Sequence, residues 1–341
     1  HLSLRRQRQM CIRDRVNLGA LKGAAAGNGP ATVAAGIIVI AIAAKAGVFP
    51  VQNWLPRTYP GTSAAVMGLF SGLHTKVAVY MLYRLWVQLF DMDERWGGLI
   101  IVIMIISMLV GSFGGLAENS IRRVLGYQML NGMPFILVMM AFTTHDAQRA
   151  LAAGILYTIH HMITVGSLIL ASGAIEETYG TGRLNKLSGL ARRDPIIAWI
   201  FAAGAFSVVG FPPFSGMWGK VLIVAEIART GGGWAWTVIA VIIIASFAAF
   251  LAMLRVWRRV FWGKDLPKEK VPKELVIRKK LMAPSAALIL GSLTMFILSG
   301  PLIEVTMEAS ADLLDTDAYS HAVLGDEPVA LPDIDSIQEG R

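Results

Sequence analysis

Six ionisable side chains lie inside long apolar stretches of the sequence, where a charged group costs about 2.5 to 3.5 kcal/mol to insert at the centre of a membrane helix. They are Lys45, Lys76, Lys220, His74, His160 and His161. Lysine amines and histidine rings held away from water can exchange protons at physiological pH. This set of residues predicts a relay that carries protons through a membrane, and it points to no bond-breaking chemistry.

Each of these residues also has a simpler interpretation. Lys76 lies far from both ends of the apolar stretch 63–86, so we expect a function there, although it could be a structural lysine paired with a backbone carbonyl. Lys45 could extend its stem to the membrane surface, and Lys220 could reach water through a helix break. Any one histidine alone could be a core residue. His74 precedes Lys76 by two residues, so the two point to different faces of a helix.

The composition places the chain in a membrane. Of its 341 residues, 55% are hydrophobic and 16% are charged, and the mean hydropathy is +0.57, whereas a soluble domain carries roughly a quarter charged residues. The net charge of +8 comes from basic residues between the apolar segments, where orientation in a membrane explains them better than nucleic-acid binding. We therefore expect a lipid bilayer as partner and no nucleic acid.

Motifs for other chemistry are missing from the sequence. The single cysteine, Cys11, excludes disulfides within the chain and thiolate metal sites. The sequence contains no phosphate-binding glycine loop, no metal-ligand cluster and no nucleophile with a base at a suitable spacing. We therefore expect no cofactor, no metal and no enzyme active site.

Apolar stretches of about 20 residues predict an all-α, polytopic membrane bundle with about eight transmembrane helices. The predicted spans are 31–50, 64–90, 97–117, 123–142, 148–175, 195–228, 234–257 and 283–303. Basic residues gather in alternate loops, from Arg57 to the run that ends at Lys280, and the positive-inside rule makes that side cytoplasmic.

Glycine and proline interrupt two of these spans, so two broken helices are predicted. The breaks lie at 46–50 and 210–214, and each contains a Phe-Pro step. Proline removes a backbone donor, so the carbonyls that it frees at membrane depth must face protein or water. Paired breaks of this kind indicate the ion pathway of a transporter built from inverted repeats.

The membrane domain is predicted at 16–305, between two segments of different composition. Residues 1–15 hold five arginines and fit neither a secretory leader nor the start of a span, so we interpret them as an artefact or a foreign lead. The chain from Val16 onward looks like part of a longer transporter. Residues 306–341 are acidic and are predicted to form a disordered tail on the outer side.

Several motifs resemble the antiporter-like membrane subunits that respiratory complex I shares with the multisubunit Mrp cation/proton antiporters. The stretch KAGVFPVQNWLPRTYPGTSAAVMGLFSGLHTKVAVYMLYRL (Lys45 to Leu85) has two lysines 31 residues apart, which is similar to the pumping lysines of that family's seventh and eighth helices. IRRVLGY (121–127) is similar to the basic turn before its tenth helix, and PPFSGMWGK (212–220) to its broken twelfth helix. YTIHHM (157–162) and GLARRDP (189–195) look most like the Mrp D subunit.

The resemblance implies an N-terminally truncated D subunit, helices seven to fourteen of fourteen, in an antiporter that exchanges sodium or another monovalent cation for protons. The implied proton path enters near Lys45, passes Lys76 and the three histidines, and leaves at Lys220. The fifth-helix glutamate that pairs with the first lysine in this family is not in the chain, and Val165 and Gly166 stand where D subunits often have a lysine. Other membrane subunits of the complex are the implied partners, in the plasma membrane of a prokaryote.

Two alternatives stay open. The same relay would serve a proton-pumping membrane subunit of an NADH-quinone oxidoreductase (complex I) or of a membrane-bound hydrogenase, in which it is coupled to electron transfer. In the other alternative the chain is a structural scaffold whose lysines are merely packed in the bundle.

Overall fold

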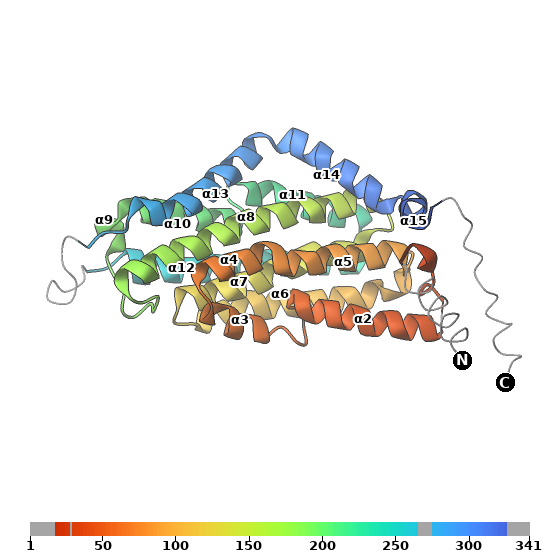
Figure 1. Cartoon of the computed structure of the whole chain (residues 1–341), viewed down its shortest axis with the longest axis horizontal. Helices are drawn as coiled ribbons and strands as arrows, with labels where there is room; N and C mark the ends of the chain where they lie inside the picture. The colour runs from red at the N-terminus through yellow and green to blue at the C-terminus, as the bar shows by residue number, and fades with distance from the viewer. Residues whose placement is uncertain (1–17, 28, 265–274, 326–341) are drawn as a thin grey trace, which may run out of the picture.

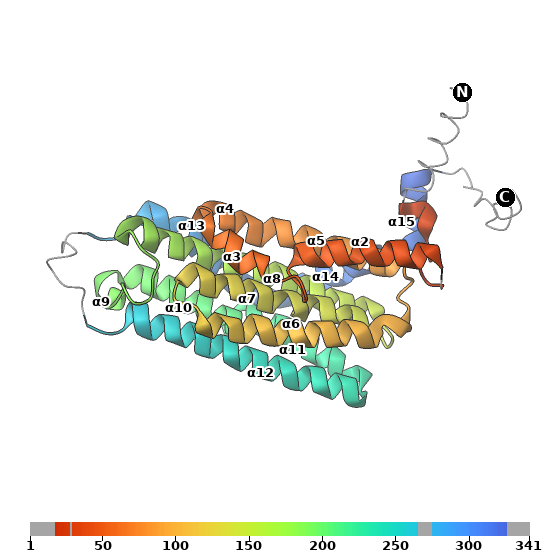
Figure 2. The same ribbon diagram turned by 90° about the horizontal axis from the view of Figure 1, so that it is seen from below.

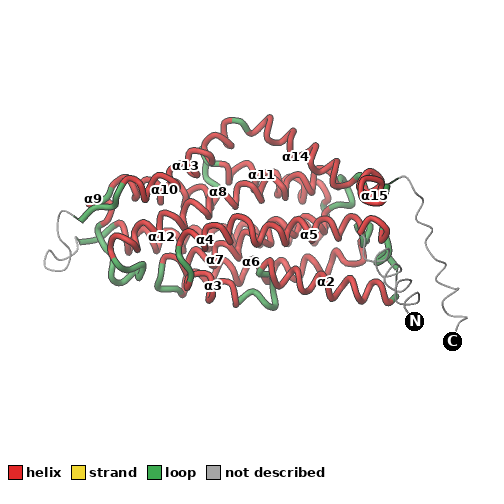
Figure 3. The backbone as a smooth tube through the Cα atoms, in the orientation of Figure 1, coloured by secondary structure: helices red, strands yellow, loops and turns green. Residues whose placement is uncertain are grey.

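The computed structural model describes residues 18–27, 29–264 and 275–325. Within these ranges the regular structure is helical, apart from one isolated β-bridge between Ser120 and Arg183. Most of the helices lie side by side along the long axis of the molecule and are joined by short loops (Figures 1 and 3). The prediction of an all-α polytopic membrane bundle is confirmed.

Six helical segments in the described part of the chain are long and apolar enough to cross a membrane. They are α4–η3–α5 (Ala64–Leu69, Phe70–His74 and Thr75–Gln88), η4–α6 (Glu94–Trp96 and Gly97–Ala117), α7–η5 (Ile121–Leu137 and Val138–Phe142), α8 (Ala147–Tyr179), α12–η6 (Gly232–Val256 and Trp257–Phe261) and α13 (Lys279–Ile297). Two further apolar helices, α2 (Pro30–Ala46) and α10 (Pro195–Val209), are shorter. Each of the eight predicted spans therefore contains a helix, and the two shorter helices belong to the spans with predicted breaks.

The remaining elements of the described ranges connect and cover these helices. They are η1 (Leu18–Leu21), α3 (Trp54–Thr58), η2 (Tyr59–Gly61), α9 (Leu190–Arg193), α11 (Ser215–Thr230), α14 (Ser299–Leu314) and α15 (Thr316–Leu324).

Glycines end the two shorter helices at the predicted breaks. Gly47 follows α2 with a φ of 78°, and Gly210 follows α10 with a φ of 101°. Both values lie in the left-handed region, which glycine adopts without a steric cost and which ends a helix. The long predicted span 195–228 is therefore two helices, α10 and α11, with the turn 210–214 between them.

Helix α8 runs through the middle of the bundle, where it contacts α4, α7, α10, α11, α13 and α14 (Figures 1 and 2). The apolar core around it falls into two clusters along its length. Four buried residues of α8 between positions 150 and 157 belong to one cluster, and six between positions 165 and 175 belong to the other. The segment 158–164, which contains His160 and His161, lies between the two clusters, so the bundle has a polar layer between two apolar ones.

The last predicted span is bent, which differs from the single straight crossing expected at 283–303. Helix α13 ends at Ile297 and α14 begins at Ser299, and the two meet at an angle on the outside of the bundle (Figure 1). Pro301 accounts for the bend, because a proline ring collides with the carbonyl four residues earlier in a continuous helix.

The acidic tail predicted to be disordered from residue 306 is instead helical as far as Leu324, in α14 and α15. Composition alone gave the wrong prediction, because α14 packs against α8 and buries Thr306 and Leu313. Helix α15 runs across the end of the bundle (Figure 2), and the Asp315 side chain accepts a hydrogen bond from the N–H of Ala318 at its start. The predicted lead 1–15 and the rest of the tail, 326–341, lie outside the described residues.

Candidate functional site

Lys76 and His161 form a direct contact in the polar layer. The Lys76 amine lies 2.8 Å from Nδ1 of His161, and it donates to the hydroxyl of Thr75 at 3.2 Å. The second ring nitrogen of His161 lies 3.4 Å from the backbone carbonyl of Gln128 on α7. Lys76 is 7% exposed and His161 is 3% exposed, so this amine and this ring are held away from the surface of the bundle.

Two local features of the backbone position this pair. The π-helical turn η3 inserts one extra residue per turn just before Lys76, and such turns occur frequently at functional sites. On α7, Gly132 lies against the His161 ring so closely that a Cβ there would be 1.9 Å from two ring atoms. Glycine at position 132 is therefore required for the ring to occupy this place.

His160 contacts a cluster of hydroxyl groups rather than a lysine. Its Nδ1 lies 2.8 Å from the hydroxyl of Ser215 and 3.2 Å from that of Thr164. The hydroxyls of Thr164 and Ser207 are 2.9 Å apart, and Ser292 is 2.9 Å from Ser207 and 2.8 Å from Ser215. We call these four residues, Thr164, Ser207, Ser215 and Ser292, the hydroxyl cluster; it joins α8, α10, α11 and α13.

Sequence reasoning did not find the hydroxyl cluster. All four side chains are buried, but serine and threonine are common in membrane helices and often bond to their own helix. A usable signal was the position of Ser215, in the first turn after the second helix break.

Lys220 lies on α11, beyond that break. Its amine donates to the carbonyl of Val209 at 2.7 Å and to the hydroxyl of Ser246 at 2.9 Å. Val209 is the last residue of α10, so its carbonyl is one that the helix break frees, as the sequence predicts. The amine also lies 5.2 Å from the centre of the Phe135 ring, which stacks on Tyr157.

Lys45 and His74 lie apart from this group. His74 hydrogen-bonds with the hydroxyl of Tyr59 at 2.8 Å and packs among aromatic rings, including that of Trp54. Lys45 is half-buried in the last turn of α2, and within the described ranges its amine has no hydrogen bond or ion pair. The structure confirms that His74 and Lys76 point to different faces.

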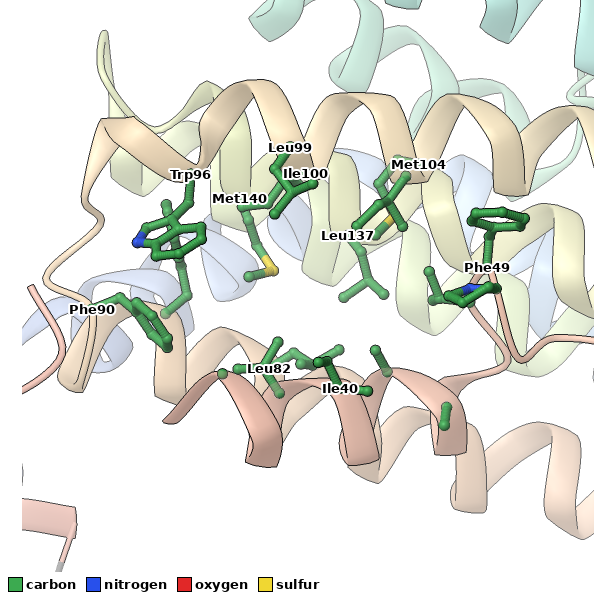
Figure 4. Close-up of a pocket in the computed structure, with 18 of the residues that line it drawn as sticks. Ile40, Phe49, Leu82, Phe90, Trp96, Leu99, Ile100, Met104, Leu137 and Met140 are labelled. Atoms are coloured by element: carbon green, nitrogen blue, oxygen red, sulfur yellow. The ribbon is translucent and has the colours of Figure 1, made fainter. Parts of the chain in front are cut away.

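An apolar cavity lies elsewhere, between α2, α5, α6 and α7 (Figure 4). Its volume is about 260 Å³. Phe49 lies at one end, Trp96 lies at the other, and Leu82 faces Ile100 across it. The residues that line it include no ionisable side chain, so none of the six predicted relay residues lines this cavity.

Residues 13–251 match the model of a protein family described as the transmembrane part of NADH:quinone oxidoreductases and Mrp antiporters. This match covers more than half of the chain. The chain belongs to this family. The predicted resemblance to this family is thereby confirmed, and the matched range contains Lys45, Lys76, the paired histidines and Lys220.

Curated relatives of the chain include bacterial antiporter subunits. The D subunit of the Na(+)/H(+) antiporter of Alkalihalophilus pseudofirmus is 30% identical over 298 residues, which are 87% of this chain and 59% of that protein. The protein of the same name in Bacillus subtilis is 30% identical over 86% of this chain and 58% of that protein. The chain thus spans less than two thirds of the length of these relatives.

Solved structures of the family share the fold. A chain of the Mrp complex from Dietzia sp. superposes with a TM-score of 0.83 at 34% identity, covering 91% of this chain and 64% of that chain. A chain of respiratory complex I from Thermus thermophilus has a TM-score of 0.71 at 21% identity, over 84% of this chain and 60% of that chain. At that identity the second likeness shows the fold alone.

Proposed function

We propose that the chain is part of a D-type subunit of a multisubunit Na⁺/H⁺ antiporter, and that it moves protons in exchange for sodium or another monovalent cation. The observation that carries the proposal is the contact of 2.8 Å between Lys76 and His161, buried in the middle of the bundle. Its partners would be other membrane subunits of the complex in the plasma membrane of a prokaryote. The names of the antiporter relatives support this function, whereas the complex I likeness supports only the fold.

The inner part of the proposed path runs from Lys76 to the hydroxyl cluster. Lys76 passes a proton to Nδ1 of His161, and the adjacent residue on α8, His160, is bonded to Ser215. The Tyr157 ring lies 5.3 Å from the ring of His160 and 6.3 Å from that of His161. Positive charges on Lys76 and His161 at the same time, 2.8 Å apart, are unfavourable in a low-dielectric site. A proton that arrives at one of these groups therefore favours the release of a proton from the other.

The two ends of the proposed path are Lys45 with His74 on one side and Lys220 on the other. No direct hydrogen bond joins the hydroxyl cluster to Lys220 in the described part of the chain. We propose that water completes this step, because a helix break frees backbone carbonyls at membrane depth, and such carbonyls bind water where protein partners are missing.

Buried polar atoms on α7 support a hydrated layer. Both side-chain amide atoms of Gln128 and the side-chain oxygen of Asn131 are buried and have no hydrogen-bond partner among the described residues. Buried polar groups of this kind are usually satisfied by ordered water. They lie on the helix that also carries the carbonyl facing His161.

Replacing Lys76 in the intact antiporter tests the proposal. We expect Lys76→Ala to abolish sodium-dependent proton exchange in everted membrane vesicles, because the relay loses its central amine, and Lys76→Arg to abolish it as well, because a guanidinium does not release its proton at any physiological pH. Lys186→Ala, which removes an exposed lysine outside the bundle core, is the matched control and should exchange at the wild-type rate. Full exchange by Lys76→Ala at wild-type abundance would refute the proposal and favour a structural lysine.

A further inference from the structure

An open apolar groove lies between α10 and α12 at the basic end of the bundle. Its volume is about 490 Å³, and apolar side chains line it throughout. Its wall on α10 runs from Pro195 to Val209, which is about 21 Å of helix at 1.5 Å per residue. Half of a bilayer's hydrocarbon core is about 15 Å deep, so the groove reaches from the membrane surface to the helix break, about the depth of one leaflet.

A basic rim adjoins the groove. A second hollow, of about 550 Å³, is lined by Leu251, Leu254, Arg255, Arg258 and Arg259. Leu254 lines both the groove and this hollow, so the two are neighbours on α12 and η6.

The three arginines of the rim differ in their partners. Arg255 is engaged by protein, since it donates to the carbonyls of Leu116 and Glu118 and to the side chain of Asn119. Arg258 and Arg259 are exposed and, over the ranges that the structure describes, have no hydrogen-bond or ion-pair partner. Two guanidinium groups in the hollow beside the apolar groove are thus available to an anion.

Two exposed tryptophans lie at the same end of the bundle as the basic rim. Trp199 is 76% exposed and Trp262 is 56% exposed, and both line the groove. Tryptophan is enriched where a membrane protein meets the lipid headgroups. The groove therefore opens to lipid, with its basic rim at headgroup level.

We propose that this groove binds an acidic phospholipid, with one acyl chain along α10 and the phosphate at Arg258 and Arg259. The charges are complementary, since juxtamembrane arginines on the basic face attract anionic headgroups. A free phosphate has no apolar part, so it would not contact the apolar wall of the groove. A helix of a neighbouring protein would fill the wall, but it would leave both guanidinium groups unpaired unless it brought acidic residues of its own. This inference is separate from the proton path, because no lysine, histidine or hydroxyl side chain of the path lines the groove; the two share only Val209, whose carbonyl accepts from Lys220.

Native mass spectrometry of the purified full chain in a neutral detergent tests the proposal. The chain is mixed with equal amounts of dioleoyl phosphatidylglycerol and dioleoyl phosphatidylcholine, and the retained lipid is counted. We expect the acidic lipid to be retained roughly thirtyfold more, from two arginines near the headgroup. R258Q/R259Q should remove that preference, whereas R183Q/K186Q, which takes two charges from exposed residues that line neither hollow, should keep it.

Two further arms separate the lipid from other occupants. Ala202→Phe narrows the groove without changing its charge and should lower the retention of the acidic lipid. An excess of glycerol phosphate, which has the headgroup chemistry without an acyl chain, should not displace it. The proposal would be overturned by equal retention of the two lipids or by an equal effect of the two double variants. Displacement of the acidic lipid by glycerol phosphate would also overturn it. Unchanged retention by Ala202→Phe would overturn it as well and would leave a protein partner as the occupant of the groove.

Discussion

Lys76 and His161 lie 85 residues apart in the sequence and share one hydrogen bond of 2.8 Å between Nζ and Nδ1. The other ring nitrogen, Nε2, faces the carbonyl of Gln128 at 3.4 Å. A carbonyl accepts and does not donate, so the ring carries its hydrogen on Nε2, and Nδ1 is left to accept from the amine. The geometry thus orients Lys76 as donor and His161 as acceptor in the neutral state of the ring.

Removing the acceptor should destabilise the protein as well as stop transport. His161→Leu leaves the Lys76 amine buried with the Thr75 hydroxyl and the Met133 sulfur as its remaining neighbours, and an unsatisfied buried polar group costs about 1 to 3 kcal/mol. We expect the free energy of unfolding to fall by that amount and sodium-dependent proton exchange to be lost. His145→Ala, in an exposed loop, should change neither measurement. Wild-type exchange by His161→Leu would show that the ring is packing alone.

A substitution at Gly132 would test the contact between Lys76 and His161 by steric displacement of the ring. In Gly132→Ala the new Cβ would stand 1.9 Å from two atoms of the His161 ring, so the ring must move away from Lys76. Overpacking of this kind costs about 1 to 3 kcal/mol, and we expect lower thermal stability and reduced exchange. Gly166→Ala on α8 is the matched control, because its nearest contact is 3.5 Å away. If Gly132→Ala transports normally at wild-type stability, the close approach of α7 to the ring is not required.

The hydroxyl cluster should affect transport more than stability. Ser292→Ala removes hydrogen bonds to Ser207 and Ser215, and a neutral hydrogen bond contributes about 0.5 to 1.5 kcal/mol. We expect the unfolding temperature of Ser292→Ala to lie within a few degrees of wild type and its proton exchange to be slower. Ser292→Thr should restore the exchange rate because it keeps a hydroxyl. Thr294→Val on the same helix removes a hydroxyl that bonds to its own helix at Leu290 and should leave exchange unchanged. Equal rates for Ser292→Ala and Thr294→Val would remove the cluster from the path.

The sequence predicts the depth of the path better than its connections. Apolar length places His160 and His161 in the middle of a span, and α8 indeed buries both between two apolar clusters. The glycine–proline break predicts a freed carbonyl near Lys220, and the carbonyl of Val209 accepts from that lysine. These features follow from one helix at a time, which is why periodicity and breaker residues reveal them.

Features that depend on several helices were missed. Ser207, Ser215 and Ser292 come from three helices and meet only after packing, and no spacing in the sequence joins them. The glycine at 132 matters because of a ring on another helix. Similarly, α14 is acidic at its end and was predicted to be disordered, yet contact with α8 stabilises it. Tertiary burial outweighs local composition in each case.

Tyr59 predicts an alkaline transition outside the membrane-spanning helices. It lies in η2, between α2 and α4, and burial raises its pKa from 10.0 to about 12. The neutral phenol is therefore favoured in the folded state, so its contribution to stability is complete below pH 10 and is lost as the pH rises toward about 12. We expect the thermal unfolding temperature of the wild type to fall over this window more steeply than that of Tyr59→Phe, which has no phenol to ionise. Tyr319→Phe, on α15 at the end of the bundle, is the matched control and should follow the wild type. If the unfolding temperatures of Tyr59→Phe and the wild type fall in parallel between pH 10 and 12, ionisation of this phenol does not oppose the fold. In that case its hydrogen bond with His74 does not hold the phenol neutral.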